Sequence, residues 1–311
     1  MHTLTYIGLK KIGRRVPCIR TTKRFNSNLS PPEYCLELIR KYDYENFICT
    51  ILLKSKSRSV AVAVRSFNVE VARVAEQVSQ KDIGLMRLKF WEEVIEKCYS
   101  NDIKQVPRHP VAVELFKAIT HANITRRYLC NLVSARQDNI SAFSKFKTLE
   151  DIEKYAEKSV SSSYYLILEG CGVKNINADH AASHLGKAQG IVQQLRCIPY
   201  AKKLNLITVP DEILFKNRLS EDSLIKGKDL KKLSDCVYEI ATIAHQHLQK
   251  SRSLMEKVPK EGRIALLPAQ SVSMYLDRLQ ASDYNVLDPH LQRRSWVLLP
   301  RVYFNMLKNR Y

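Results

Sequence analysis

Residues 60–78 read VAVAVRSFNVEVARVAEQV, and their apolar pattern decides the fold class. The larger apolar side chains recur at alternating steps of four and three residues, at Val60, Val64, Phe67, Val71, Val74 and Val78. This spacing is typical of one face of an α-helix, whereas a half-buried strand alternates at every second residue. Although valine favours strands, the period is not two, and we predict a helix here.

The same helical period continues along the chain after residue 30. Ser30-Pro31-Pro32-Glu33 is a capping-box pattern with proline at the first helical position, which predicts a helix start. Further helices are predicted at 85–99, 110–121, 125–138, 148–168, 178–198, 230–250 and 271–279. The breaks between them, at 101–109, 170–172, 199–210 and 259–262, are short, and none resembles an interdomain linker. The sequence therefore predicts an all-α fold with a single helical domain.

The N-terminal stretch differs from the rest in charge. Its first thirty residues carry seven lysines and arginines and no acidic residue, the first of which is Glu33. Apolar residues at roughly helical spacing accompany these charges, as in a matrix-targeting presequence. We predict a mitochondrial presequence at 1–28 and a folded domain at 29–311; a disordered basic arm is the alternative interpretation.

Charge and composition limit the kinds of partner and the cellular environment that the sequence allows. The formal charge is +19, and about +12 remains without residues 1–30, which favours anionic surfaces such as a cardiolipin-rich membrane. No recognisable nucleic-acid module with interleaved aromatics is present, so no nucleic-acid partner is predicted. The sequence has no apolar run of eighteen residues and thus no predicted membrane span. Eight scattered cysteines without a CxxC pair are interpreted as reduced, mostly buried thiols.

The sequence contains no recognisable nucleotide-binding or nucleophile motif. Its glycines form neither a Rossmann fingerprint nor a P-loop, and no nucleophile elbow occurs. His180 and His184 stand four residues apart, on one helix face, and are the only candidate metal ligands. A third ligand is not identifiable, so hydrogen-bonded structural histidines are the preferred interpretation. We predict no metal and no cofactor.

Several segments resemble, in order and spacing, the squalene/phytoene synthase family. The resemblance spans nearly all of residues 34–290 and is carried by FICTILL (47–53), AVRSFNVEVARVAE (63–76), LMRLKFWEEVIEKCY (85–99), HPVAVELFKAI (109–119), YAEKSVSSSYYLILEGCG (155–172), LGKAQGIVQQLR (185–196), TVPDEIL (208–214) and LLPAQSVSMYLDRLQASDYNVLDP (266–289). The stretch ADHAASHLGKAQGIV (178–192) resembles one branch, the mitochondrial complex I assembly factor 6 type. The family implies an isoprenoid-synthase bundle of helices around a central cavity.

Active members of this family carry aspartates on facing helices that hold Mg²⁺ against a substrate diphosphate. The first family motif reads approximately A-F-C-x-x-x-D-D-x-x-D, and the matching stretch here is 66–76. Aligned on Phe67, the adjacent aspartate positions are Ala72 and Arg73, and only Glu76 stays acidic. A methyl group and a cation cannot replace carboxylate ligands of magnesium.

The second family motif, L-G-x-A-x-Q-x-T-N-I-L-R-D-x-x-x-D, matches residues 185–201. Cys197 and Ala201 occupy its two aspartate positions, and neither side chain is a hard oxygen ligand. Arg196 stands at a family basic position. Together with Arg73 it is a candidate contact for an anionic ligand, and a structural ion pair is the alternative for Arg196.

The resemblance implies a non-catalytic assembly factor, a pseudoenzyme that serves mitochondrial respiratory complex I and its early membrane-arm module containing ND1. It also implies complex I subunits or other assembly factors as partners, and a peripheral location on the matrix side of the inner membrane. Two alternatives are a protein that binds an apolar lipid or isoprenoid, and a divergent prenyltransferase that uses Glu70, Glu76 and Asp179.

The residues after Asp288 include no acidic side chain and mix basic with large apolar residues. This composition suits a peripheral membrane interface. The alternative is a terminal helix packed on the bundle, and Pro300 is expected to limit a continuous amphipathic helix.

Overall fold

The computed structural model describes residues 29–78, 80–141, 145–201 and 207–311. The predicted presequence, 1–28, lies outside the described residues. Within the described ranges the chain is helical and contains no strand, as the hydrophobic period predicts. No helix in these ranges is both long enough and apolar enough to cross a membrane.

The first half of the domain consists of six helices, α1 (Pro31–Tyr42), α2 (Tyr44–Ile51), α3 (Ser55–Gln77), α4 (Lys81–Tyr99), α5 (Pro110–Ala122) and α6 (Arg126–Ser141). α7 (Leu149–Ala156) continues through a π-helical turn, η1 (Glu157–Ser161), into α8 (Ser162–Gly170). The remaining α-helices are α9 (Ile176–Cys197), α11 (Asp211–Lys216), α12 (Glu221–Lys226), α13 (Leu230–Ser253), α14 (Lys260–Arg263), α15 (Ala269–Ala281) and α16 (Leu298–Leu307).

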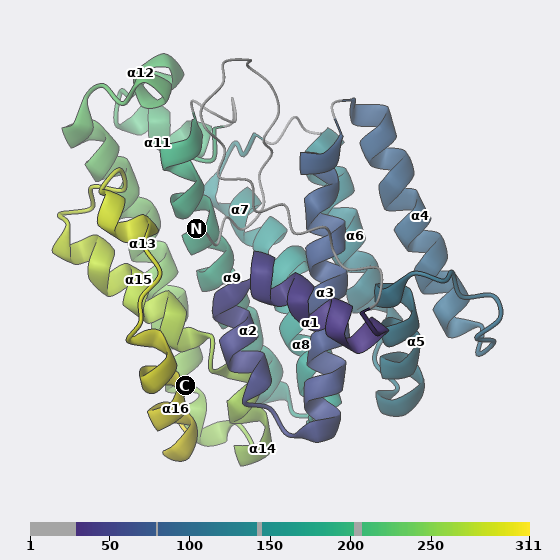
Figure 1. Cartoon of the computed structure of the whole chain (residues 1–311). Coiled ribbons are helices and arrows are strands. Elements are labelled where there is room, and N and C mark those ends of the chain that lie inside the picture. Colours follow the sequence, from purple (N-terminus) through teal and green to yellow (C-terminus); the bar gives the residue numbers. More distant parts are fainter. Residues whose placement is uncertain (1–28, 79, 142–144, 202–206) are drawn as a thin grey trace.

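Long helices run along the length of the molecule, with α3, α4 and α6 on one side and α9, α13 and α15 on the other (Figure 1). α9 packs against α13, and also against α7, η1, α8 and α15. α3 packs against α1, α5 and α8. α3 and α9 carry the two stretches that resemble the family motifs, so the fold places both stretches in the interior of the bundle.

Close packing around α9 depends on two glycines. A Cβ atom added to Gly186 would lie 2.6 Å from backbone atoms of Ser161, and one added to Gly190 would collide with Ala156. Gly190 faces the end of η1 next to α7 and Gly186 faces the end next to α8, so a larger side chain at either position would push α9 away. The predicted helix at 148–168 thus contains a π-helical turn at its closest contact with α9, a feature that periodicity does not reveal.

The long observed helices agree with the predicted ones. The short helices α2, α11, α12 and α14 were not predicted, and α14 overlaps the predicted break at 259–262. Pro300 does not prevent a C-terminal helix, because it is the third residue of α16, where the missing N–H has no intrahelical partner to lose. The seven described cysteines form no disulfide, and five of them are buried.

Candidate functional site

The first motif stretch lies on α3, and the second lies on α9 and the residues directly after it. Ala72, Cys197 and Ala201 are buried, and Glu76 is partly buried. Burial raises the pKa of Cys197 to about 12; the nearby Arg196 lowers it and the Glu76 carboxylate adds a smaller increase. This electrostatic influence places the Glu76 carboxylate of α3 near the Cys197 thiol of α9.

Arg73 turns its charge toward an aromatic ring. Its guanidinium carbon lies 3.8 Å from the centre of the Tyr42 ring on α1, a cation–π contact. Arg73 also lowers the pKa of Glu76, but burial has the larger effect and raises that pKa above its ordinary value. This face of α3 therefore carries one cation and one carboxyl group in place of several carboxylates, which is unsuited to a magnesium ion.

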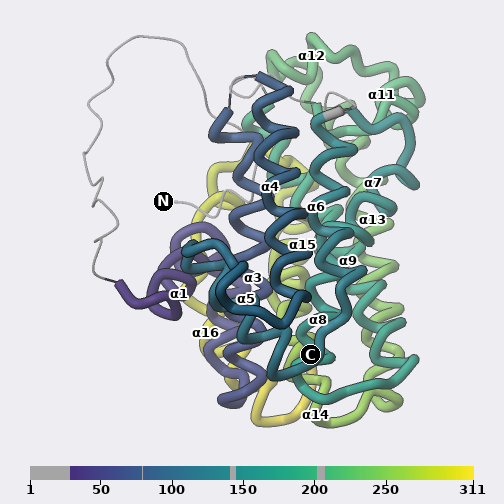
Figure 2. Tube along the Cα trace, turned by 90° about the vertical axis from the view of Figure 1, so that its right-hand side faces the viewer, coloured from purple at the N-terminus to yellow at the C-terminus, as the bar shows by residue number. Residues whose placement is uncertain are grey.

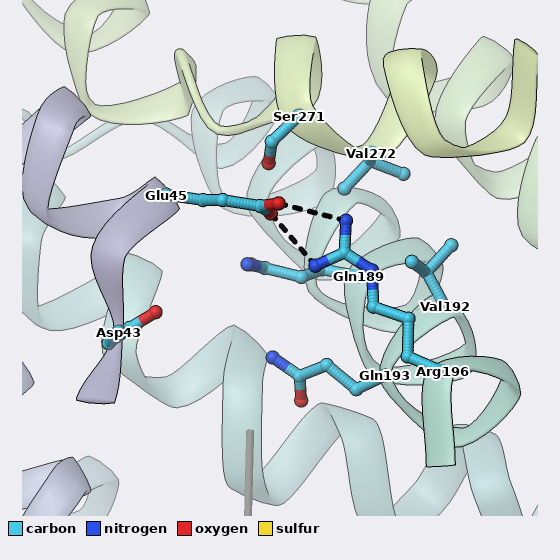
Figure 3. Close-up of a pocket in the computed structure, with 8 residues that line it drawn as sticks. All are labelled: Asp43, Glu45, Gln189, Val192, Gln193, Arg196, Ser271 and Val272. Carbon is cyan, nitrogen blue, oxygen red and sulfur yellow. Dashed lines mark hydrogen bonds and ion pairs between the residues drawn. The ribbon is translucent and has the colours of Figure 1, made fainter. Parts of the chain in front are cut away.

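Arg196 forms a two-bonded ion pair with Glu45, a residue of α2 (Figure 3). Its two terminal nitrogens each donate to one Glu45 oxygen at 3.0 Å. The guanidinium carbon also lies 4.6 Å from the centre of the Tyr275 ring on α15. Burial alone would lower the pKa of Arg196, but Glu45 more than offsets this and raises it. The interpretation of Arg196 as a structural ion-pair partner is the one that the geometry supports.

A second buried pair lies beside the first. Arg65 of α3 approaches the Asp43 carboxylate at 4.0 Å, and both side chains are almost fully buried. Asn46 donates to Asp43 at 2.9 Å and accepts from Gln189 of α9 at 3.4 Å. Burial raises the pKa of Asp43, while Arg65 acts in the opposite direction. Two arginines and two carboxylates thus neutralise each other where α2, α3 and α9 meet.

Little free space remains next to the Arg196–Glu45 pair. The pocket in Figure 3 is lined by Asp43, Glu45, Gln189, Val192, Gln193, Arg196, Ser271 and Val272 and has a volume of about 10 Å³. That volume holds roughly one water molecule. A diphosphate would enter this pocket only if Glu45 released Arg196.

Of the two candidate metal-binding histidines, His184 lies in a hydrogen-bonded group and His180 does not. His184 pairs with His247 of α13, with 2.9 Å between their Nδ1 atoms, and His247 Nε2 lies 3.3 Å from Glu153. His180 is exposed and forms no part of this group. Among the described residues, no group of three or more histidine, cysteine or acidic side chains is arranged to hold a metal ion.

The acidic residues of the prenyltransferase alternative are not brought together. Glu70 accepts a hydrogen bond from the Tyr34 hydroxyl at 3.2 Å. Asp179 lies in the first turn of α9, eighteen residues before Cys197 and so roughly 27 Å away at 1.5 Å per residue. Asp179 is therefore too far from Glu76, which lies near Cys197, for the two carboxylates to bind the same metal ion.

Sequence reasoning did not find Asp43, Glu45, Arg65 and Tyr275. Glu45 and Arg196 are separated by 151 positions, and no local pattern connects them. The available signal was weaker: Asp43 and Glu45 lie on either side of Tyr44, just before an apolar stretch, and such acidic residues become buried only when paired.

The helical bundle with two facing motif helices defines the isoprenoid-synthase class. The chain superposes on the crystal structure of squalene synthase HpnC from Alicyclobacillus acidocaldarius with a TM-score of 0.71 and 18% identity, over 82% of this chain and 95% of that one. A dehydrosqualene synthase in complex with ligand gives a TM-score of 0.73 and 16% identity, over 89% and 97%. At these identities the likeness shows the fold alone.

Sequence comparison identifies the family. The squalene/phytoene synthase model matches residues 39–299. NADH dehydrogenase (ubiquinone) complex I, assembly factor 6, of Homo sapiens is 38% identical over 98% of this chain and 92% of its own length. The Bos taurus protein is 39% identical over 89% and 82%, and the Dictyostelium discoideum homolog is 31% identical over 88% and 76%. The chain belongs to the squalene/phytoene synthase family, in the branch of these assembly factors.

Proposed function

We propose that this chain is a non-catalytic assembly factor for mitochondrial respiratory complex I. The similarity to the assembly factor 6 proteins over nearly the whole chain supports this role. The early membrane-arm module that contains ND1 is the proposed target, and its subunits or other assembly factors are the proposed partners. The protein acts on the matrix side of the inner membrane, as a peripheral protein directed there by residues 1–28.

One observation supports the lack of catalysis more than any other: Arg196 is paired with Glu45. In an enzyme that ionises a diphosphate, metal ions and free cations stabilise the charge on the leaving group. Here the Arg196 cation is already neutralised by a carboxylate at 3.0 Å. Cys197 and Ala201 stand at the positions of the second acidic pair and provide no metal ligand. The bundle thus serves as a scaffold for partners.

The role is tested by deleting the gene and measuring assembled complex I beside the other respiratory complexes on native gels. We expect selective loss of complex I and early disappearance of newly made ND1 in pulse-labelled mitochondria. Wild-type protein should restore both. Equal loss of all complexes, or normal complex I, would contradict the role.

Rescue with Glu76→Gln separates a scaffold from a divergent enzyme. Glu76 is the one acidic side chain that remains at an aspartate position of the first motif, so catalysis through a rearranged metal site would need it. We expect full rescue by this variant at equal protein level. A rescue defect, together with Mg²⁺-dependent consumption of farnesyl diphosphate by purified wild-type protein, would establish the prenyltransferase alternative.

A further inference from the structure

One end of the bundle has a pocket that is separate from the motif stretches 66–76 and 185–201. It is lined by residues of α14, the start of α3 and the C-terminal end of α16. α14 and the start of α3 lie at the lower end of the molecule in Figures 1 and 2. Its volume is about 450 Å³, compared with about 10 Å³ beside Arg196. We refer to it below as the α14–α16 pocket.

Positive charge surrounds this pocket. Four cationic side chains line it and only one acidic residue, Glu261, does so; the four are Lys54, Lys260, Arg263 and Arg310. Arg263 donates to the backbone oxygen of Val258 at 3.0 Å and lies 3.5 Å from Glu256. Lys54, Lys260 and Arg310 are exposed, and their side chains make no ion pair or hydrogen bond with the part of the chain that the structure describes. Three cations are therefore available to an anion.

Part of the lining of the α14–α16 pocket is an apolar wall. It is formed by Leu52, Ile264, Leu267 and Met306, which belong to or pack against one small core cluster. A free inorganic anion is strongly hydrated and gains nothing from such a wall. An anion attached to a hydrocarbon chain matches both parts, because its phosphate meets the lysines and its apolar part meets the wall.

Beside the pocket, α16 presents an exposed apolar face. Leu298 and Val302 pack inward against α2, and Met306 lines the pocket. Leu299, Tyr303 and Leu307 follow at four-residue steps on the adjacent face, and each is about half exposed or more. Phe304 and Trp296 are also exposed, by 60% and 86%. Aromatic and aliphatic side chains next to basic ones are typical of helices that lie in a membrane interface.

We infer that the α14–α16 pocket binds the phosphate head group of an anionic phospholipid in a bilayer, with the exposed face of α16 inserted among the neighbouring acyl chains. Charge complementarity and the continuity of pocket and apolar face at Met306 carry this inference. It rests on the peripheral placement in the proposed function and specifies the surface responsible. Such a docking would orient the bundle with the paired arginines of α3 and α9 away from the lipid.

Vesicle binding by the full-length protein tests the head-group contact. Vesicles of phosphatidylcholine are compared with vesicles containing phosphatidylglycerol, in the wild type and in a Lys54→Gln, Lys260→Gln, Arg310→Gln variant. Each basic residue near an anionic surface contributes roughly a fivefold factor in affinity, so we expect about a 100-fold loss on the anionic vesicles. Inorganic phosphate at millimolar concentration should not compete; full competition would identify a site for free phosphate and overturn the inference.

A matched variant controls for general electrostatic attraction. Lys89→Gln, Lys97→Gln, Lys104→Gln removes the same charge from exposed positions in and after α4. The basic N-terminal stretch is present in every variant, so differences among variants report on the pocket. We expect the control to lose no more than about fivefold. Equal losses in the two triple variants, or none in either, would contradict the pocket.

Tryptophan fluorescence tests the insertion of α16 independently. The chain has two tryptophans, Trp296, which is 86% exposed, and Trp91, which is 5% exposed in the core. Brominated acyl chains in anionic vesicles should quench the Trp296 emission, and the quenching should disappear in Trp296→Phe. Binding without quenching would refute insertion of this face.

These measurements need no complex I, so they can fail separately from the proposed function. Loss of vesicle binding in the pocket variant with poor complex I rescue would support both claims. If the pocket variant lost vesicle binding but rescued assembly fully, the lipid site would stand and its link to assembly would fall. Wild-type protein that does not bind anionic vesicles would overturn the lipid site alone.

Discussion

At position 196, the fold gives a guanidinium group a structural partner. Arg196 lies between the Glu45 carboxylate and the Tyr275 ring, and its two ion-pair contacts of 3.0 Å are those of a two-bonded arginine–carboxylate pair. The family motif predicts an arginine at this position, but the sequence alone left its role open. The fold decides the role of Arg196, because it brings Glu45 of α2 beside Arg196 of α9 although the two residues are 151 positions apart.

Removing Arg196 should destabilise the protein more than removing both partners. Arg196→Met leaves the Glu45 carboxylate partly buried without its cation, and we expect a loss of roughly 3 kcal/mol in the free energy of unfolding. The Arg196→Met, Glu45→Met double variant should recover most of it, as a double-mutant cycle in urea would show. A cost below about 0.5 kcal/mol for Arg196→Met would mean that the pair adds nothing and that Arg196 is free for another role.

Glu76 should make the stability depend on pH. Burial raises its pKa, so the folded state binds the proton more tightly than the unfolded state does, and a penalty appears as pH rises above the unfolded pKa. Glu76→Gln imitates the protonated form. We therefore expect the variant to be more stable than the wild type at pH 7 to 8, with a difference that vanishes toward pH 4. Urea unfolding across this range measures it; a constant difference would indicate a cause other than titration.

At the level of the elements, the helices follow from the hydrophobic period, and their ends follow from local chemistry. α1 begins at the predicted capping box, in which Ser30 Oγ donates to Glu33 at 2.7 Å and the Glu33 side chain accepts from the Ser30 backbone N–H at 2.9 Å. Pro300 falls in the first turn of α16, where a helix accepts proline, so the C-terminal helix begins only at Leu298. The hydrophobic period does not reveal the π-helical turn η1, whose last residue, Ser161, packs against Gly186 on another helix.

This contact should make Gly186 intolerant of a methyl group. An added Cβ would lie 2.6 Å from the Ser161 backbone, which has no freedom to move aside. We expect Gly186→Ala to lose about 1–3 kcal/mol in the free energy of unfolding, despite the better helix propensity of alanine.

Gly84 provides the matched control. It is also helical and buried, but its nearest neighbours, at 3.2 Å and 3.4 Å, are the side-chain ends of Val78 and Ile140. Gly84→Ala should be neutral or gain up to about 1 kcal/mol. Guanidinium unfolding of both variants compares them, and equal costs would argue against close packing of α9 on η1.

At the scale of the whole molecule, the order of motif-like segments was sufficient to predict the bundle, because it resembles the family whose members share this fold. The positions of the charged side chains in the folded bundle could not be predicted from the sequence. The interior neutralises its charges in pairs such as Asp43–Arg65, whereas Lys54, Lys260 and Arg310 gather at one end through folding alone.

We propose that the interior of this bundle no longer holds a metal-bound diphosphate. Calorimetric titration of the purified protein with pyrophosphate in the presence of Mg²⁺ tests this proposal, with EDTA as the control. We expect no saturable heat up to millimolar pyrophosphate, because Arg196 is occupied by Glu45 and the motif positions lack carboxylates. Saturable binding at micromolar concentration that EDTA abolishes, and that Glu76→Gln weakens, would contradict the account.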